Sequence, residues 1–155
     1  MEIIVVTAVI ALLAAMAIPA MLRARTTAQE TVAIGNLKAL VGALAVYQST
    51  YHLYPAAADW STALYDDPEP DFGPPAFHQA LDGSAVVQGY AYEYVPYGGG
   101  TTYILRASPE RLGQTGTRTF WANDDGIVFH CDGDSAADII PGAAVPVTQS
   151  PIACP

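Results

Sequence analysis

The sequence predicts an α+β fold in which one long N-terminal helix packs on a C-terminal antiparallel β-sheet. Two observations predict it. An uncharged apolar run passes into a stretch with helical periodicity over residues 3–51, and four short segments with strand character alternate with glycine-rich turns over residues 90–131. We therefore divide the chain into an apolar helix over 1–24, an amphipathic continuation over 25–54 and a globular head over 55–155.

The apolar helix is predicted from the 20 residues between Ile3 and Leu22, none of which carries a charge. At a rise of about 1.5 Å per residue, a helix of this length spans the roughly 30 Å of a bilayer core. A cleaved secretory signal opens with a basic stretch, and here no Lys or Arg precedes the run. We therefore expect a retained transmembrane helix, although Arg23 and Arg25, counted alone, would place the C-terminal side in the cytoplasm.

Beyond the apolar run, apolar side chains recur near steps of three and four residues, as one face of a helix requires. These are Val32, Leu37, Leu40, Val41, Leu44, Tyr47 and Tyr51. Because small or polar residues separate them, we expect the head to cover this face. The helix is predicted to end at Tyr54 and Pro55, since the residue before a proline avoids helical geometry.

Three residues weaken this helix. Pro19 removes one backbone hydrogen bond and clashes with the preceding turn at a cost of about 3 kcal/mol, so we expect a kink or a local loss of helix there. In an assembled filament, we expect the helix to lose regular hydrogen bonding between Ala14 and Leu22. Gly35 and Gly42 each cost about 1 kcal/mol relative to Ala. Either they make the helix easier to bend, or they permit close packing against a neighbour.

The head begins with a proline-rich connection over residues 55–89, in which we expect short helices around Trp60–Tyr65 and Ala76–Leu81. Strands are predicted at Tyr90–Tyr97, Thr101–Ala107, Thr117–Ala122 and Gly126–Cys131. The glycine-rich turns between them favour an antiparallel meander. Tyrosines at every second position of the first strand predict one aromatic face, which fills the core between sheet and helix.

The two cysteines, Cys131 and Cys154, are predicted to form a disulfide, because an even count in an exported chain more often means a bridge than free thiols. A bridge across 23 residues contributes on the order of 3 kcal/mol in the chain-entropy model. Two unrelated buried thiols are the alternative. A metal site is not expected, since His130 is the only neighbouring histidine and no paired cysteine spacing exists.

The charge is divided unevenly, and this argues against nucleic acid as a partner. Residues 1–54 carry a net charge of +1 and residues 55–155 carry a net charge of −10, which together give the total of −9. An acidic body repels nucleic acid unless Arg106, Arg111 and Arg118 cluster.

No enzyme is predicted either, because none of the three histidines lies in a serine or cysteine motif that would supply a nucleophile. Asp132, Asp134 and Asp138 lack the glycine and the distal glutamate of a calcium loop, so we interpret them as a solvated acidic turn. We expect no cofactor and no metal.

The segment from Glu2 to Pro19 resembles the N-terminal helix of type IV pilins and type II secretion pseudopilins. It begins with EIIVV, ends with AAMAIP, and is followed by LRAR at residues 22–25. That family has a glutamate near its mature N-terminus and a proline 17 residues later, which is the spacing of Glu2 and Pro19. The resemblance is strongest over residues 1–55, and the strand-rich head is compatible with it. Family members start a few residues ahead of the glutamate with a methylated phenylalanine, after a leader, so we expect residues ahead of Met1.

The resemblance implies a structural subunit of a type IV pilus or pilus-like filament, built from identical copies that polymerise through the N-terminal helix. It implies processing by a prepilin peptidase, an inner-membrane assembly platform, and an inner-membrane pool that precedes the filament at the cell surface. Glu2 would pair with the terminal amine of a neighbouring subunit. A carboxylate at mid-bilayer depth costs about 2.5 to 3.5 kcal/mol, so it needs such a partner.

Two alternatives stay open. Within the family, the chain would be a type II secretion pseudopilin or a minor pilin, although major pseudopilins usually order their C-terminal loop with calcium, and the cysteine pair favours a pilin. Outside it, the chain would be a single-pass, membrane-anchored periplasmic binding domain. A helix that only tethers does not need Glu2 at this spacing.

Overall fold

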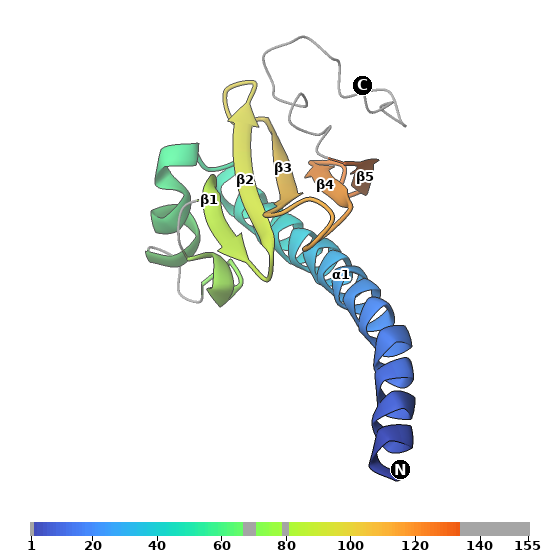
Figure 1. The fold of residues 1–155 in the computed structure, drawn as a ribbon. Coiled ribbons are helices and arrows are strands. Elements are labelled where there is room, and N and C mark those ends of the chain that lie inside the picture. Colours follow the sequence, from blue (N-terminus) through green and yellow to red (C-terminus); the bar gives the residue numbers. More distant parts are fainter. Residues whose placement is uncertain (1, 67–70, 79–80, 134–155) are drawn as a thin grey trace.

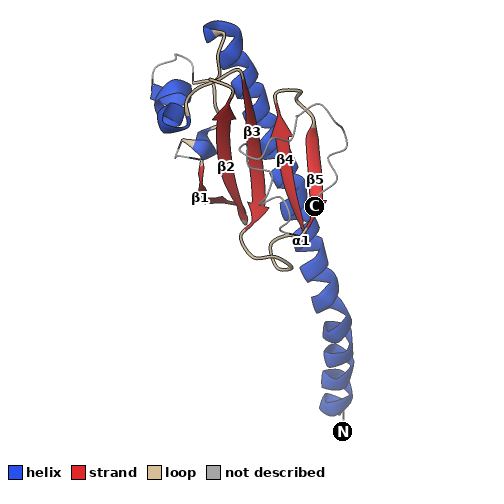
Figure 2. Cartoon of the chain, turned by 90° about the horizontal axis from the view of Figure 1, so that it is seen from above, coloured by secondary structure: helices blue, strands red, loops and turns tan. Residues whose placement is uncertain are grey.

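A computed structural model of the chain describes residues 2–66, 71–78 and 81–133. Within them, one long helix packs against a five-stranded antiparallel sheet (Figures 1 and 2). The elements are α1 (Glu2–Tyr51), β1 (Asp82–Val87), β2 (Tyr90–Tyr97), β3 (Thr102–Pro109), β4 (Arg118–Asn123) and β5 (Val128–Asp132). The strands lie in sequence order, so the sheet is a simple meander, and the predicted α+β class is confirmed.

The C-terminal half of α1 lies along one face of the sheet and contacts β3, β4 and β5 (Figure 1). Its side of the core includes Leu37, Leu40 and Leu44, all completely buried. These three leucines recur at steps of three and four residues, so they share one helix face. The predicted packing of this face under the head is confirmed, except that Val32 and Tyr51 are 37% and 51% exposed.

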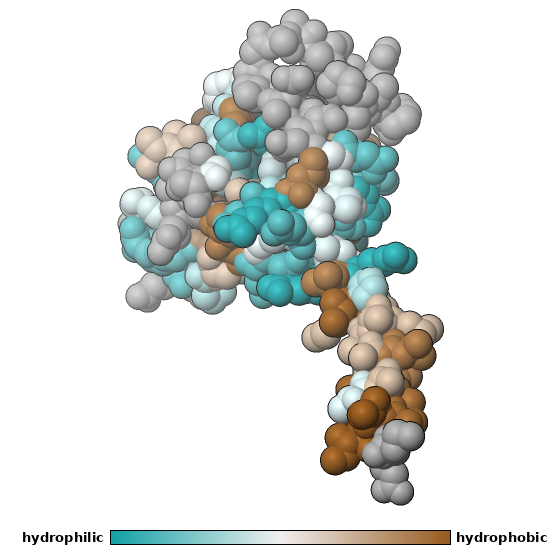
Figure 3. All heavy atoms as spheres, in the orientation of Figure 1, coloured by the Kyte–Doolittle hydropathy of each residue, from teal (hydrophilic) through white to brown (hydrophobic). Residues whose placement is uncertain are grey.

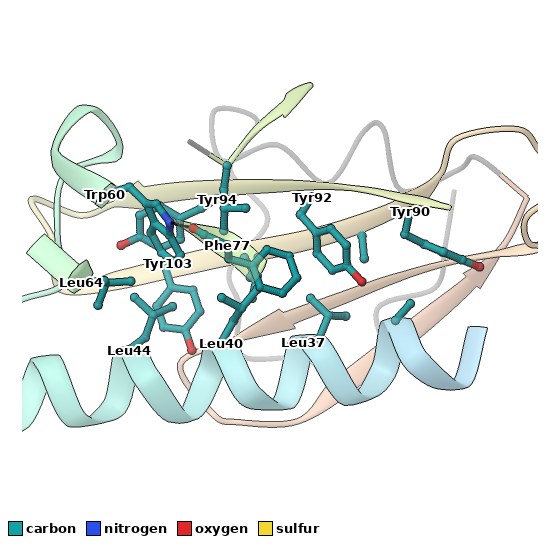
Figure 4. Packing of buried hydrophobic residues seen from close by; sticks show 14 of the residues in the cluster. Leu37, Leu40, Leu44, Trp60, Leu64, Phe77, Tyr90, Tyr92, Tyr94 and Tyr103 are labelled. Atoms are coloured by element: carbon teal, nitrogen blue, oxygen red, sulfur yellow. Dashed lines mark hydrogen bonds between the residues drawn. The ribbon is translucent and has the colours of Figure 1, made fainter. Parts of the chain in front are cut away.

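The predicted aromatic face of β2 forms the other side of the core. Tyr90, Tyr92 and Tyr94 are buried and point from the sheet toward α1 (Figure 4). Their hydroxyl groups find partners at the edges of the core, because a buried phenol without one would cost free energy. Tyr92 accepts a hydrogen bond from the side chain of Asn36 over 3.1 Å, and Tyr94 donates to the carbonyl of Pro55 over 2.8 Å.

The segment between α1 and the sheet forms short helical turns at Ala57–Asp59, Thr62–Asp66 and Pro75–Phe77. The indole of Trp60 lies 4.6 Å from the ring of Tyr94, centroid to centroid, and its N–H donates to the carbonyl of Phe77. The first two turns correspond to the helix predicted around Trp60–Tyr65. Of the second predicted helix, Ala76–Leu81, only the turn that ends at Phe77 is observed; His78 and Leu81 are not helical, and residues 79–80 lie outside the described ones.

The observed elements differ from the predicted ones at several points. The strand β1 was missed, because Gly83 interrupts its short pattern and its pairing with β2 shifts register between Asp82 and Val86. The last strand begins at Val128 rather than at Gly126, whose positive φ of 75° belongs to the preceding turn. Helix α1 ends at Tyr51, before Pro55, because His52 adopts a left-handed conformation with φ of 62°.

Pro19 does not melt the helix in this single chain. α1 is continuous from Glu2 to Tyr51, although its axis changes direction between the half below the sheet and the half that projects away (Figure 1). A proline in a helix interior removes one hydrogen bond and favours such a bend. The expected loss of helix beside Pro19 in an assembled filament stays a prediction.

Candidate assembly and membrane surface

The projecting half of α1 is a continuous apolar surface that no described part of the head covers. Its large apolar side chains are between 52% exposed, at Val9, and 79% exposed, at Ile3. Figure 3 shows this half as a mostly brown stem below a head whose described residues are largely hydrophilic on the face in view. The stem consists of residues 3–22, and we call it the apolar stem.

Water is an unfavourable environment for the apolar stem. Twelve large apolar side chains between Ile3 and Leu22 are exposed, and leaving them in water costs on the order of 20 kcal/mol at typical transfer free energies. Among the described residues, α1 is the one helix long and apolar enough to cross a membrane, with a best-window mean hydropathy of 2.7. Length and composition alone do not separate a membrane span from a signal sequence. They do require that lipid or another apolar surface cover the stem.

Of the two residues predicted to act in assembly, Pro19 lies within the stem and Glu2 directly precedes it. Glu2 is the first residue of α1, and its side chain lies outside what the structure describes. Pro19 lies one turn before the stem meets the head. Their roles in assembly concern contacts between copies and stay predictions.

Glu30 joins the stem to the head at the first turn of α1 that the sheet covers. Its Oε1 accepts hydrogen bonds of 2.8 Å from both the N–H and the hydroxyl of Thr117. Its Oε2 accepts from Nε and Nη2 of Arg118, over 3.0 and 2.6 Å. A carboxylate with four donors is well compensated for its burial, so this group fixes the start of β4 onto the helix.

The pKa of Glu30 records this environment. Burial alone would raise the pKa. Four favourable interactions outweigh burial and lower the pKa below its ordinary value: the hydrogen bonds from the Thr117 N–H, from Arg118 and from the Thr117 hydroxyl, and the positive charge of Arg118. The carboxylate is therefore ionised whenever the head is folded near neutral pH, and the joint depends on that charge.

Next to this joint, a cleft of about 790 Å³ opens between α1 and the connection from β3 to β4. Helix residues between 22 and 29 line one side, and loop residues between 110 and 117 line the other. Figure 2 shows the loop beside α1 where the helix leaves the sheet. We call this the neck cleft.

Comparison of this chain with protein-family models, with curated proteins and with solved structures finds no match. The function is therefore inferred from the surfaces of the molecule itself, and above all from the exposed apolar stem.

The remaining predicted site residues are only partly placed. Cys131 is buried on β5, while Cys154 lies outside the described residues, so the predicted disulfide stays a prediction. Asp132 is exposed, and Asp134 and Asp138 are likewise outside the described part. Within the described residues, no three His, Cys, Asp or Glu side chains lie together as metal ligands would.

The three head arginines have different surroundings. Arg106 pairs with Glu93 across β2 and β3, and Arg118 pairs with Glu30. Arg111 lines the neck cleft with Arg23 and Arg25. Two of the three head arginines are therefore neutralised by carboxylates of the chain itself, and only Arg111 faces the cleft.

Sequence reasoning missed Glu30 and the position of Arg111. The one signal for Glu30 is that it is the only acidic residue between residues 3 and 58, in a segment otherwise free of carboxylates. Nothing in the sequence around Arg111 indicates that it lies beside residues 23–25, because only the folding of the sheet onto α1 brings them together.

Proposed function

We propose that the chain is a structural subunit of a type IV pilus-like filament, which is held in the inner membrane by the apolar stem and polymerises through it. The observation that carries the proposal is one continuous helix. Its second half buries one face under the folded head, while the large apolar side chains of its first part, the 20 uncharged residues of the stem, are all more than half exposed. A lipid bilayer before assembly, and the stems of other copies after it, would each cover that surface.

The resemblance of the stem to pilins supports this proposal over a plain tether. A tether requires apolar length only, whereas Glu2 and Pro19 stand at the family spacing. In a bundle of stems, a carboxylate near the apolar core is stabilised by a neighbour's terminal amine in a low-dielectric environment. A prepilin peptidase and an inner-membrane platform are the partners that such an assembly requires.

A pseudopilin or a minor pilin is the second candidate, because it would have the same stem and head. Electron microscopy of sheared surface material from cells that express the chain distinguishes them. Abundant filaments composed mainly of this chain support a major subunit. A chain found only at trace level in filaments made of another protein supports a minor one.

The direct test is Glu2→Ala. We expect the head to stay folded and the chain to stay in the membrane, because removing a charge from an apolar segment favours retention. Filament yield should fall sharply, since a buried amine without its partner costs on the order of 3 to 5 kcal/mol at every subunit added. Immunoblots of sheared and membrane fractions provide the measurement.

Glu2→Asp is the matched control, because it retains a carboxylate at the same position and should retain part of the filament yield. Equal yield from Glu2→Ala and wild type would show that apolar packing alone drives polymerisation. If wild type itself stays in the membrane fraction without filaments, the helix is a tether.

A further inference from the structure

The neck cleft contains half of the basic residues of the chain. Of six Lys and Arg residues, Arg23, Arg25 and Arg111 line it, and Glu110 is the only carboxylate among its lining residues. The cleft therefore has a net charge of +2, on a chain whose total charge is −9. Such a concentration of positive charge marks a site for an anion.

The side chains of these arginines are available to a ligand. All three residues are exposed, and in the described part of the chain no carboxylate lies within ion-pair distance of them. By contrast, Arg106 and Arg118 are already paired with Glu93 and Glu30. Among the arginines, the three at the neck are thus the ones without a paired carboxylate within the described residues.

Their position specifies the depth at which that anion would lie. Leu22 is the last residue of the apolar stem and also lines the cleft, and Arg23 follows it directly. If the stem crosses a bilayer, the cleft lies at the level of the lipid head groups. Arg111 reaches the same level from the β3–β4 connection, so the cleft has a wall on the helix and a wall on the head.

We propose that the neck cleft binds the phosphate of an anionic phospholipid, which holds the head against the membrane surface before assembly. This inference rests on the membrane anchoring included in the proposed function. Arginine side chains donate to phosphate oxygens in a planar fork that suits this ligand.

The test uses the full chain in nanodiscs made from equal amounts of phosphatidylglycerol and phosphatidylcholine. Native mass spectrometry after release counts the lipids of each kind that stay bound. Wild type should retain phosphatidylglycerol in preference, and Arg111→Gln should lower that preference about fivefold, the usual contribution of one arginine near an anionic surface. Arg111 lies outside the stem, so this variant leaves insertion unchanged.

Lys38→Gln is the matched control, because Lys38 is an exposed cation on α1 outside the neck cleft, and its loss should leave the preference unchanged. An excess of inorganic phosphate should not displace the lipid, and displacement would indicate a free-anion site instead.

Equal retention of both lipids by an inserted wild-type chain would overturn the proposal. So would an unchanged preference in Arg111→Gln accompanied by weaker self-association, which would assign the cleft to a second copy. Failure of the chain to insert would instead contradict membrane anchoring itself.

Discussion

The two halves of α1 belong to one uninterrupted helix but are in contact with different surroundings. Leu40, in the second half, is completely buried beneath the sheet, whereas Leu13, in the first, is 59% exposed. Both segments are rich in apolar side chains. The second half is apolar on one face only, and this face matches the aromatic surface of β2; the first is apolar all round, as expected for a helix surrounded by lipid or by other helices.

This difference separates folding from assembly. The buried half needs only the head of its own chain, so its packing is decided when the chain folds. The exposed half has no partner within the described residues, and its free energy is lowered only by a membrane or by other copies. Substitutions in the two halves should therefore affect different measurements, and this is the basis of the predictions below.

The largest effect on head stability is expected from Leu40→Ala. Removing a fully buried leucine side chain leaves a cavity between α1 and the sheet, and should lower the free energy of unfolding by about 3 kcal/mol. Urea titration in detergent micelles, followed by tryptophan fluorescence, measures this, because Trp60 and Trp121 are both buried in the head. Leu13→Ala is the control and should change the head by less than about 0.5 kcal/mol. Similar losses in both variants would show that the stem is part of the folding unit.

A smaller effect is expected from Glu30→Gln, which tests the joint between the halves. The variant keeps the size of the side chain but loses the ionised acceptor of four hydrogen bonds, and should lower stability by about 2 kcal/mol near pH 7. Because the folded-state pKa of Glu30 is lowered, its contribution is fully present above the unfolded-state pKa and is lost as the pH falls through the folded-state pKa.

The difference in stability between wild type and Glu30→Gln should therefore shrink as the solution is made acidic. Thermal unfolding monitored by near-UV circular dichroism over a series of acidic pH values provides the measurement. Glu110→Gln, at an exposed carboxylate, is the control. A difference that stays constant across the acidic range would mean that the charge of Glu30 does not hold the joint.

The smallest effect is expected from Gly35→Ala and Gly42→Ala. A methyl group added at either position meets no atom within 4 Å, so each substitution should stabilise the head by up to about 1 kcal/mol through helix propensity. The filament assay then decides between the two readings of these glycines. Reduced filament yield despite a more stable head would indicate close packing between copies, and unchanged yield would show that the exposed glycines are not contact points.

Several features of the fold could be predicted because they depend on local patterns. The alternation of Tyr90, Tyr92 and Tyr94 is a property of neighbouring residues, and so is the helical recurrence of Leu37, Leu40 and Leu44. Strand β1 was not predicted, since its glycine and register shift leave no clear alternation, and it becomes a strand by pairing with β2.

The sequence by itself determined that residues 3–22 form an uncharged apolar helix long enough to span a bilayer, because length, charge and hydropathy require no knowledge of distant contacts. It also determined the α+β class. Only the tertiary structure decided that Glu30 binds Thr117 and Arg118, and that Arg111 joins Arg23 and Arg25 at the neck. Glu30 is more than 80 positions from Thr117 and Arg118, and Arg23 and Arg25 are equally far in sequence from Arg111. The meander brings the β3–β4 connection back to the helix.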